Sequence, residues 1–293
     1  MKKLSYLVLF ICTISSAQSI LSPSKKLQLS FSISKEGKPT YSVNFKNQPI
    51  VKESSLGIVL KDADGLVANF KIDSIGHKSV NETWQPVLGE QSNIKNNYNE
   101  MTAALSQPAT GRKINIIFRV FDEGVAFRYE FPKQKNLNYF IISDEKTEFN
   151  LVGNHKAFWL PGDYDSQEYP YTESKLSEIN TDNIDRNNGI GLKLISVKYI
   201  VQSPLMMKTA EGVYINIFEA AVVNYPVMHL DLVPKAYQFT SHLVPNAIGD
   251  KAYLHAPCVS PWRTIMISDD ARDIVSSKMI FSLNEPCKIE DTS

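Results

Sequence analysis

The sequence has 293 residues, of which 31 are Lys or Arg and 31 are Asp or Glu, so the formal net charge at pH 7 is zero. The basic residues are scattered, and this balance gives no electrostatic case for binding nucleic acid or an anionic membrane surface. The length suits one large domain or two small ones. The composition therefore favours a neutral partner.

The N-terminus has the pattern of a secretory signal peptide. A basic start at Lys2 and Lys3 precedes a mostly apolar run, residues 4–14, and small residues follow up to Ala17. The apolar run is too short to span a bilayer, and no other segment reaches the roughly twenty apolar residues that a membrane helix needs. We expect residues 1–17 to be removed and the mature chain to be exported to the periplasm. An ordinary buried N-terminal element is the alternative.

An alternation of apolar and polar residues with period two dominates the rest of the chain. Residues 27–33 and 41–45 flank a KEGKP turn and predict a half-buried hairpin. Residues 113–121 and 125–131 flank a DEG turn and predict a second hairpin. Further strand-like runs occupy residues 213–223, 236–244 and 264–268.

A helix is indicated only once, by DDARDIVSS, where Asp269 or Asp270 could cap the start. Many strands with few, short helices indicate an all-β fold, an antiparallel two-sheet sandwich whose sheets are long and many-stranded. The chain contains no internal repeat and no Pro- or Gly-rich linker. The most polar patch, residues 180–191, predicts a surface loop.

The stretch GDYDSQEYPYT, residues 162–172, concentrates the polar chemistry of the chain directly after the apolar run AFWLP. Its side chains comprise three carboxylates, one carboxamide and three tyrosines: Asp163, Asp165, Glu168, Gln167, Tyr164, Tyr169 and Tyr171. Carboxylates suit hard cations such as calcium or magnesium, although the spacing fails the EF-hand pattern. The tyrosines and Trp159 could stack on sugar rings. A hydrated turn whose acids bond their own backbone is the third possibility.

Catalytic motifs are absent from the sequence. There is no G-x-S-x-G and no H-E-x-x-H, and one loop rarely supplies both acids of a glycosidase pair. The histidines have no short ligand spacing, so each is predicted to be a structural or surface residue. They are His77, His155, His229, His242 and His255.

Two cysteines remain once the predicted signal peptide has been removed. Cys258 and Cys287 could form a disulfide in an export compartment. Two separate buried thiols are the equally weighted alternative.

Several sequence blocks, in order, resemble the N-terminal domain of glycoside hydrolase family 97, the calcium-dependent alpha-glucosidases and alpha-galactosidases of Bacteroidota. The resemblance is to the alpha-glucosidase of starch-utilisation systems in particular, which degrades polysaccharide. The blocks are TWQPVLGE (83–90), NNYNE (96–100), FRVFDEGVAFRYEFP (118–132), FWLPGDYDSQEYPYT (158–172), LMMKTAEGVYINIFEAAVV (205–223), PCVSPWRTIMISDDAR (257–272) and LNEPCKI (283–289).

The resemblance implies one large β-super-sandwich of the galactose-mutarotase type over residues 18–289. It implies that Glu168 reaches from this domain into a neighbouring active site and helps to hold a calcium ion. Asp163, Asp165 and Gln167 match the same motif, and we expect them to shape the loop by hydrogen bonds.

The resemblance also implies a catalytic (β/α)₈ barrel, and residues 290–293 would be the truncated start of the linker to it. We therefore expect an accessory domain that is inactive alone, whose partners are a barrel, in cis or as a separate chain, and an alpha-linked oligosaccharide. An independent carbohydrate-binding module and a mutarotase-like enzyme are the alternatives. In the module, the ring of Tyr164, Tyr169, Tyr171 or Trp159 would stack on sugars.

Overall fold

A computed structural model describes residues 17–87, 89–184 and 198–289. Nearly all of the predicted signal peptide, the larger part of the polar patch 180–191 and the predicted linker start, residues 290–293, lie outside the described residues. The described part of the polar patch includes a short 3₁₀ helix, Thr181–Asn183. Among the described residues, no helix is long and apolar enough to cross a membrane.

The largest sheet has ten strands, and every neighbouring pair in it is antiparallel. The strand order is β13-β12-β15-β16-β21-β9-β8-β7-β6, with β20 also paired to β9. The strands are β6 (Lys71–Trp84), β7 (Ile94–Ser106), β8 (Lys113–Phe121), β9 (Gly124–Phe131), β12 (Lys156–Trp159), β13 (Thr172–Lys175), β15 (Leu205–Lys208), β16 (Tyr214–Ala220), β20 (Cys258–Val259) and β21 (Trp262–Ser268).

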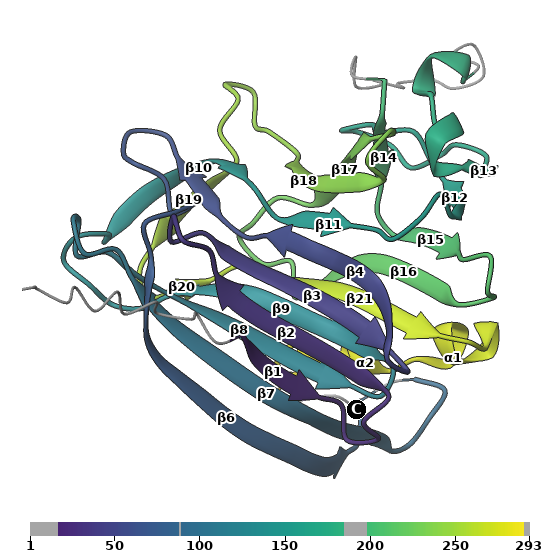
Figure 1. Ribbon diagram of the computed structural model, residues 1–293, viewed down its shortest axis with the longest axis horizontal. Coiled ribbons are helices and arrows are strands. Elements are labelled where there is room, and N and C mark those ends of the chain that lie inside the picture. Colours follow the sequence, from purple (N-terminus) through teal and green to yellow (C-terminus); the bar gives the residue numbers. More distant parts are fainter. Residues whose placement is uncertain (1–16, 88, 185–197, 290–293) are drawn as a thin grey trace, which may run out of the picture.

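Three smaller antiparallel sheets accompany the large one (Figure 1). The first is β1-β2-β3-β4, with bounds Gln18–Leu21, Leu27–Ile33, Pro39–Phe45 and Gln48–Ser55. The second is β19-β10-β5, with bounds Ala252–His255, Tyr139–Glu145 and Ile58–Leu60. The third is β11-β18-β17-β14, with bounds Glu148–Asn150, Gln238–Leu243, Met228–Val233 and Ile200–Gln202. A bridge between Val51 and Leu151 links the first sheet to the third.

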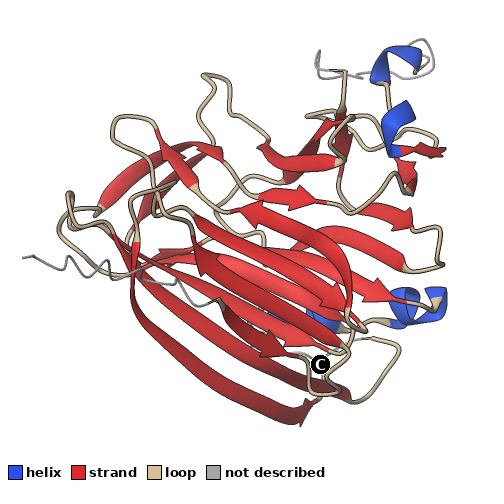
Figure 2. Ribbon diagram, in the orientation of Figure 1, coloured by secondary structure: helices blue, strands red, loops and turns tan. Residues whose placement is uncertain are grey.

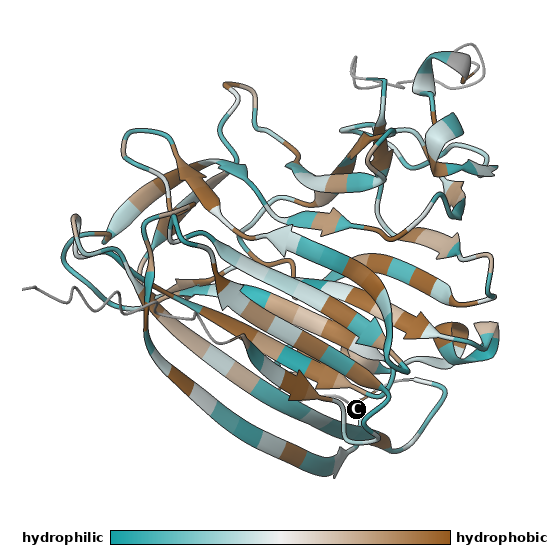
Figure 3. Cartoon of the chain, viewed as in Figure 1, coloured by the Kyte–Doolittle hydropathy of each residue, from teal (hydrophilic) through white to brown (hydrophobic). Residues whose placement is uncertain are grey.

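The main core lies between the β1–β4 sheet and the centre of the large sheet. Phe31 packs on Phe118 with 5.3 Å between ring centroids, and Tyr41 packs on Phe127 at 4.8 Å. All four rings are buried, and burying such a side chain stabilises a fold by about 1.5–3 kcal/mol. Figure 3 shows apolar and polar residues alternating along the strands. Both predicted hairpins and the all-β sandwich are therefore confirmed.

A buried ion cluster joins the large sheet to β10. The Arg263 guanidinium, on β21, lies 2.7 Å from Glu145 at the end of β10 and 2.5 Å from Glu219 on β16. The Tyr225 hydroxyl donates to Glu145 at 2.8 Å. Burial alone would lower the pKa of Arg263, but the two carboxylates raise it, so the guanidinium stays charged.

Two short helices cover a second apolar cluster on the opposite face of the large sheet (Figure 2). They are α1 (Ala271–Ser276) and α2 (Met279–Leu283). Asp270 caps α1 by accepting from the N–H of Arg272 at 2.9 Å, which confirms Asp270 as one of the two predicted caps. Helix α2 was not predicted, because it has only five residues, MIFSL, and no side-chain cap. A further 3₁₀ helix spans Leu176–Glu178.

Candidate functional site

The acidic loop, residues 162–171, joins β12 to the edge strand β13 of the large sheet. It follows Pro161, which forms a bridge with Val201 of β14. The loop is thus attached to the large sheet through β12 and to the β14-containing sheet through Pro161, at the upper right of Figure 1.

Asp163 organises the loop from inside. Its side chain is buried, with the residue 3% exposed. One carboxylate oxygen accepts the N–H groups of Asp165 at 2.8 Å and Ser166 at 3.0 Å, and the other accepts the Tyr169 hydroxyl at 2.6 Å. Because both oxygens accept hydrogen bonds within the loop, Asp163 has the contacts of a residue that shapes the turn.

Three strands of the β11-β18-β17-β14 sheet hold the loop from below. Gln202 donates to the carbonyls of Pro161 and Ser166, each at 2.9 Å. His229 Nε2 lies 2.7 Å from the carbonyl oxygen of Asp163. His242 Nε2 lies 2.7 Å from the Tyr164 hydroxyl. The sequence predicted these histidines to be structural or surface residues and did not relate them to the loop, because nothing in their spacing connects them to residues 162–172.

Glu168 contributes only its backbone to this framework. The residue is exposed, and its N–H donates to Ser166 Oγ at 3.0 Å. Within the described residues, its carboxylate forms no hydrogen bond or ion pair. Asp165 and Gln167 are also exposed. The loop therefore has a backbone held by hydrogen bonds and exposes two carboxylates, those of Asp165 and Glu168.

Two of the predicted sugar-stacking rings are buried, which corrects that expectation. Trp159 is 2% exposed and donates through its indole N–H to Ser174 Oγ, and Tyr169 is 7% exposed. The alternating pattern of β12 turns Trp159 inward, and the bond to Asp163 draws Tyr169 into the loop. Tyr164 is half-buried against the two histidines. Only Tyr171, at 63%, is an open ring among those four.

The side-chain oxygens of the acidic loop are of the type that calcium prefers, but they are too few for a complete site. Carboxylate oxygens suit calcium, which takes six to eight oxygen ligands. Within the described ranges, no group of three or more His, Cys, Asp or Glu residues is arranged to hold a metal ion. An exposed carboxylate such as that of Glu168 has the right chemistry for one calcium ligand, and the described residues do not form a complete site.

The two cysteines are free thiols. Cys258 is half-buried, and burial raises the pKa of its thiol to about 11. Cys287 is exposed. The disulfide hypothesis is thus not supported, and the alternative of two buried thiols was wrong for Cys287, which lies in an open segment after α2.

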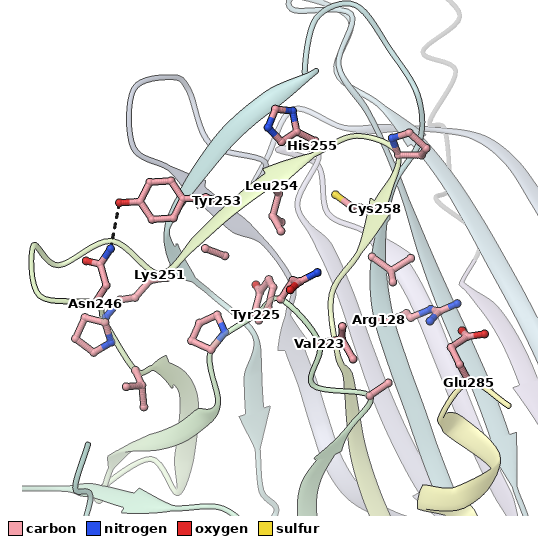
Figure 4. Close-up of a pocket in the computed structure, with 18 residues that line it drawn as sticks. Arg128, Val223, Tyr225, Asn246, Lys251, Tyr253, Leu254, His255, Cys258 and Glu285 are labelled. Atoms are coloured by element: carbon pink, nitrogen blue, oxygen red, sulfur yellow. Dashed lines mark hydrogen bonds between the residues drawn. The ribbon is translucent and has the colours of Figure 1, made fainter. Parts of the chain in front are cut away.

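A groove of about 900 Å³ lies away from the acidic loop (Figure 4). It runs between the 221–226 loop and strand β19, and Arg128 and Glu285 lie at one end of it. None of the predicted loop residues lines this groove; of the predicted site residues, only Cys258 does. Exposed valines lie beside the groove, at Val222, Val223 and Val227. Their spacing in the sequence follows no strand or helix period, so the sequence could not have identified the groove.

The geometry defines a class: a large antiparallel β-sandwich with an exposed acidic loop held on three strands. The sequence model described as Glycosyl-hydrolase 97 N-terminal matches residues 20–286, and the chain belongs to this family.

Among similar proteins is a retaining alpha-galactosidase of Bacteroides thetaiotaomicron, 24% identical over 328 residues, which covers 100% of this chain and 46% of the relative. A family 97 enzyme from Pseudoalteromonas sp. strain K8, solved with acarbose, is 32% identical with a TM-score of 0.82, over 94% of this chain and 39% of that one. A beta-arabinopyranosidase is 23% identical with a TM-score of 0.77, over 91% and 42%, and supports the fold alone. The chain thus spans less than half the length of the relatives it matches.

Proposed function

We propose that this chain supplies the N-terminal sandwich of a calcium-dependent alpha-glycosidase, packs against a catalytic (β/α)₈ domain and provides Glu168 as one calcium ligand. The observation that carries the proposal is the exposed Glu168 carboxylate on a loop whose backbone is fixed on both sides. A loop backbone that is already fixed adds little to the conformational entropy lost when a cation binds. The described residues contain no group of three or more acidic, His or Cys side chains arranged for a metal ion, and we therefore expect the isolated chain to bind calcium weakly.

The catalytic domain is the proposed partner, in cis or as a separate chain. The relatives are full-length family 97 enzymes that are more than twice as long as the region matched here. Exposed valines beside the groove support a protein partner, because a partner that covers apolar surface removes it from water. They are Val222, Val223 and Val227, of which Val223 is 67% exposed.

The proposed substrate is an alpha-linked oligosaccharide. The Pseudoalteromonas relative has been solved with acarbose and, as a variant, with panose, and another relative is named as an alpha-galactosidase. The choice between glucoside and galactoside, and between inversion and retention, belongs to residues of the catalytic domain. The signal-peptide pattern of residues 1–17 places this chemistry, by the same proposal, in the periplasm.

Tyr171 favours a second candidate function, an independent carbohydrate-binding module. Its ring is the one open aromatic surface among the four predicted, and a single ring gives weak sugar binding. Titration of the chain with maltooligosaccharides separates the candidates: binding that is tight and lost in Tyr171→Ala would favour the module.

The main test joins residues 18–289 to the catalytic region of the Pseudoalteromonas relative and measures hydrolysis of 4-nitrophenyl alpha-glycosides. We expect calcium-dependent activity in the fusion and none in the isolated chain. Glu168→Ala should raise the calcium concentration needed for half-maximal activity at least ~tenfold. The matched control Glu173→Ala, a neighbouring exposed acid on β13, should leave it unchanged. Hydrolysis by the isolated chain that Glu168→Ala abolishes would overturn the proposal.

A further inference from the structure

Three polar side chains below the acidic loop form a row across three adjacent strands. In the β11-β18-β17-β14 sheet, Gln202 of β14 lies directly opposite His229 of β17, and His229 lies directly opposite His242 of β18. Side chains at directly opposed positions of antiparallel strands point to the same face of the sheet. We call Gln202, His229 and His242 the polar row.

Each member of the polar row contacts a different part of the acidic loop or the residue that precedes it. Gln202 contacts both ends of the turn, through the carbonyls of Pro161 and Ser166. His229 contacts the Asp163 carbonyl between them, and His242 contacts the Tyr164 hydroxyl. The Tyr164 ring also lies parallel to both imidazoles, at interplanar angles of 8° to His229 and 1° to His242.

The contacts of His229 determine which of its ring nitrogens carries the hydrogen. Its Nε2 faces a carbonyl, which can only accept, so Nε2 carries the hydrogen. In the neutral ring, Nδ1 is then a bare acceptor, and Nδ1 is buried without a partner in the described structure. Burial lowers the pKa of His229, and burial also lowers the pKa of His242 to about 4. Both rings are therefore neutral at pH 7, and a neutral ring with its hydrogen on Nε2 satisfies the contact of His229.

The contacts continue from the polar row toward Glu168. Ser166, whose carbonyl accepts from Gln202, also accepts the N–H of Glu168 through its hydroxyl. On the other side, Tyr169 is bonded to Asp163, whose carbonyl His229 contacts. Both neighbours of the Gln167–Glu168 pair are thus fixed, directly or through one residue, by the polar row.

We propose that the polar row is a preassembled positioning platform that holds the acidic loop in a single conformation and so determines where the Glu168 carboxylate is presented. The inference rests on the proposed function in one respect only, namely the identity of the ligand that Glu168 binds. The platform itself is a property of the isolated chain. Gln202, His229 and His242 are positioning residues, since they act on Glu168 through the loop.

The test measures hydrogen exchange by mass spectrometry at pH 7, in peptides covering residues 161–171 and, as an internal reference, β7 and β8. A glutamine at position 242 can place its amide nitrogen near the histidine Nε2 position, whereas a shorter asparagine mimics Nδ1. His242→Asn should therefore accelerate exchange of the loop peptide roughly tenfold, the change expected when one partly buried hydrogen bond is lost. His242→Gln should change it less than about twofold.

Two further variants complete the test. Tyr164→Phe, which removes only the hydroxyl, should match His242→Asn, and the double variant should be no faster than either single one. Glu168→Ala should leave loop exchange unchanged, because its carboxylate supports nothing in the described structure. The exchange of β7 and β8 should stay constant throughout.

The outcomes separate this inference from the proposed function. Loop exchange that is equal in the native chain, His242→Asn and Tyr164→Phe would overturn the platform, whatever Glu168 binds. Acceleration of the loop and of β7 and β8 together would mean a general loss of stability, which also contradicts it. A third outcome is a loop that stays protected from exchange in a fusion whose calcium dependence is the same with and without the Glu168 carboxylate. That result would overturn the proposed function and leave the platform intact.

Discussion

Arg263 is a residue whose substitution we expect to be costly. It is fully buried between Glu145 and Glu219, and removing the guanidinium leaves two carboxylates in the core without their counter-charge. We expect Arg263→Met to lower the free energy of unfolding by about 3–5 kcal/mol, measured by urea denaturation.

An exposed ion pair provides the control for that prediction. Lys156 pairs with Glu173 at the surface between β12 and β13, where such pairs contribute little. Lys156→Met should cost at most about 0.5 kcal/mol. Equal losses in the two variants would refute the structural importance of the buried cluster.

The two thiols should differ in reactivity. Cys287 is exposed, whereas Cys258 is half-buried with a pKa raised to about 11, and only the thiolate attacks an alkylating reagent. At pH 8 we expect iodoacetamide to modify Cys287 at least ~tenfold faster than Cys258, with the sites identified by peptide mass mapping. If neither thiol reacts until a reductant is added, the two are joined in a disulfide.

At the scale of elements, regular alternation was the informative signal. Strands β2, β3, β8 and β9 were predicted from their period-two patterns, and α1 from its capping aspartate, because local residues determine these elements. Helix α2 and the burial of Trp159 were not predicted. Both depend on which part of the folded chain packs against these residues, and the local sequence pattern does not specify that partner.

Two strand glycines in the large sheet test how closely β9 and β21 pack. A Cβ on Gly124 would lie 2.4 Å from the Ile265 carbonyl oxygen and 2.8 Å from Met266 Cα, whereas a Cβ on Gly76 of β6 would meet nothing within 4 Å. Gly124→Ala should destabilise the chain by about 1–3 kcal/mol. Gly76→Ala should stay within about 0.5 kcal/mol of the native value. Thermal denaturation measures both, and equal melting temperatures would disprove the close approach.

At the scale of the whole molecule, acid should destabilise the fold through its buried histidines. The pKa of His242 is lowered from 6.5 to about 4, and that of His229 is lowered as well. The unfolded chain then binds more protons than the folded chain between about pH 4 and 6.5. The free energy of unfolding is therefore highest above pH 6.5 and falls as the pH drops through this window.

Several charges face His242 and modulate this response. Besides burial, Lys251, His229 and Lys146 lower its pKa, and Asp144 raises it. Each unit of difference between folded and unfolded pKa corresponds to about 1.4 kcal/mol, reduced here because His242 is only half-buried. His242→Gln should flatten the stability profile between pH 6.5 and 4, measured by urea denaturation at each pH. A profile as steep as the native one would assign the acid response to other groups.

The resemblance of the sequence blocks predicted the family and the all-β architecture, and both are confirmed. The support beneath the acidic loop could not be predicted in the same way. The three residues of the polar row belong to strands that are neighbours only in the folded sheet. None of them lies in a local sequence motif that would mark it as a contact of the loop.

The contacts of the polar row also bear on modularity. The hydrogen bonds that hold the loop join residues separated by 41, 66 and 78 positions in sequence. The eleven residues GDYDSQEYPYT therefore encode only part of their own shape, the part that depends on the internal bonds of Asp163. Grafted onto another scaffold they would carry the acids but lose the geometry, and an engineer wishing to move this feature would have to transfer a patch of sheet along with the peptide.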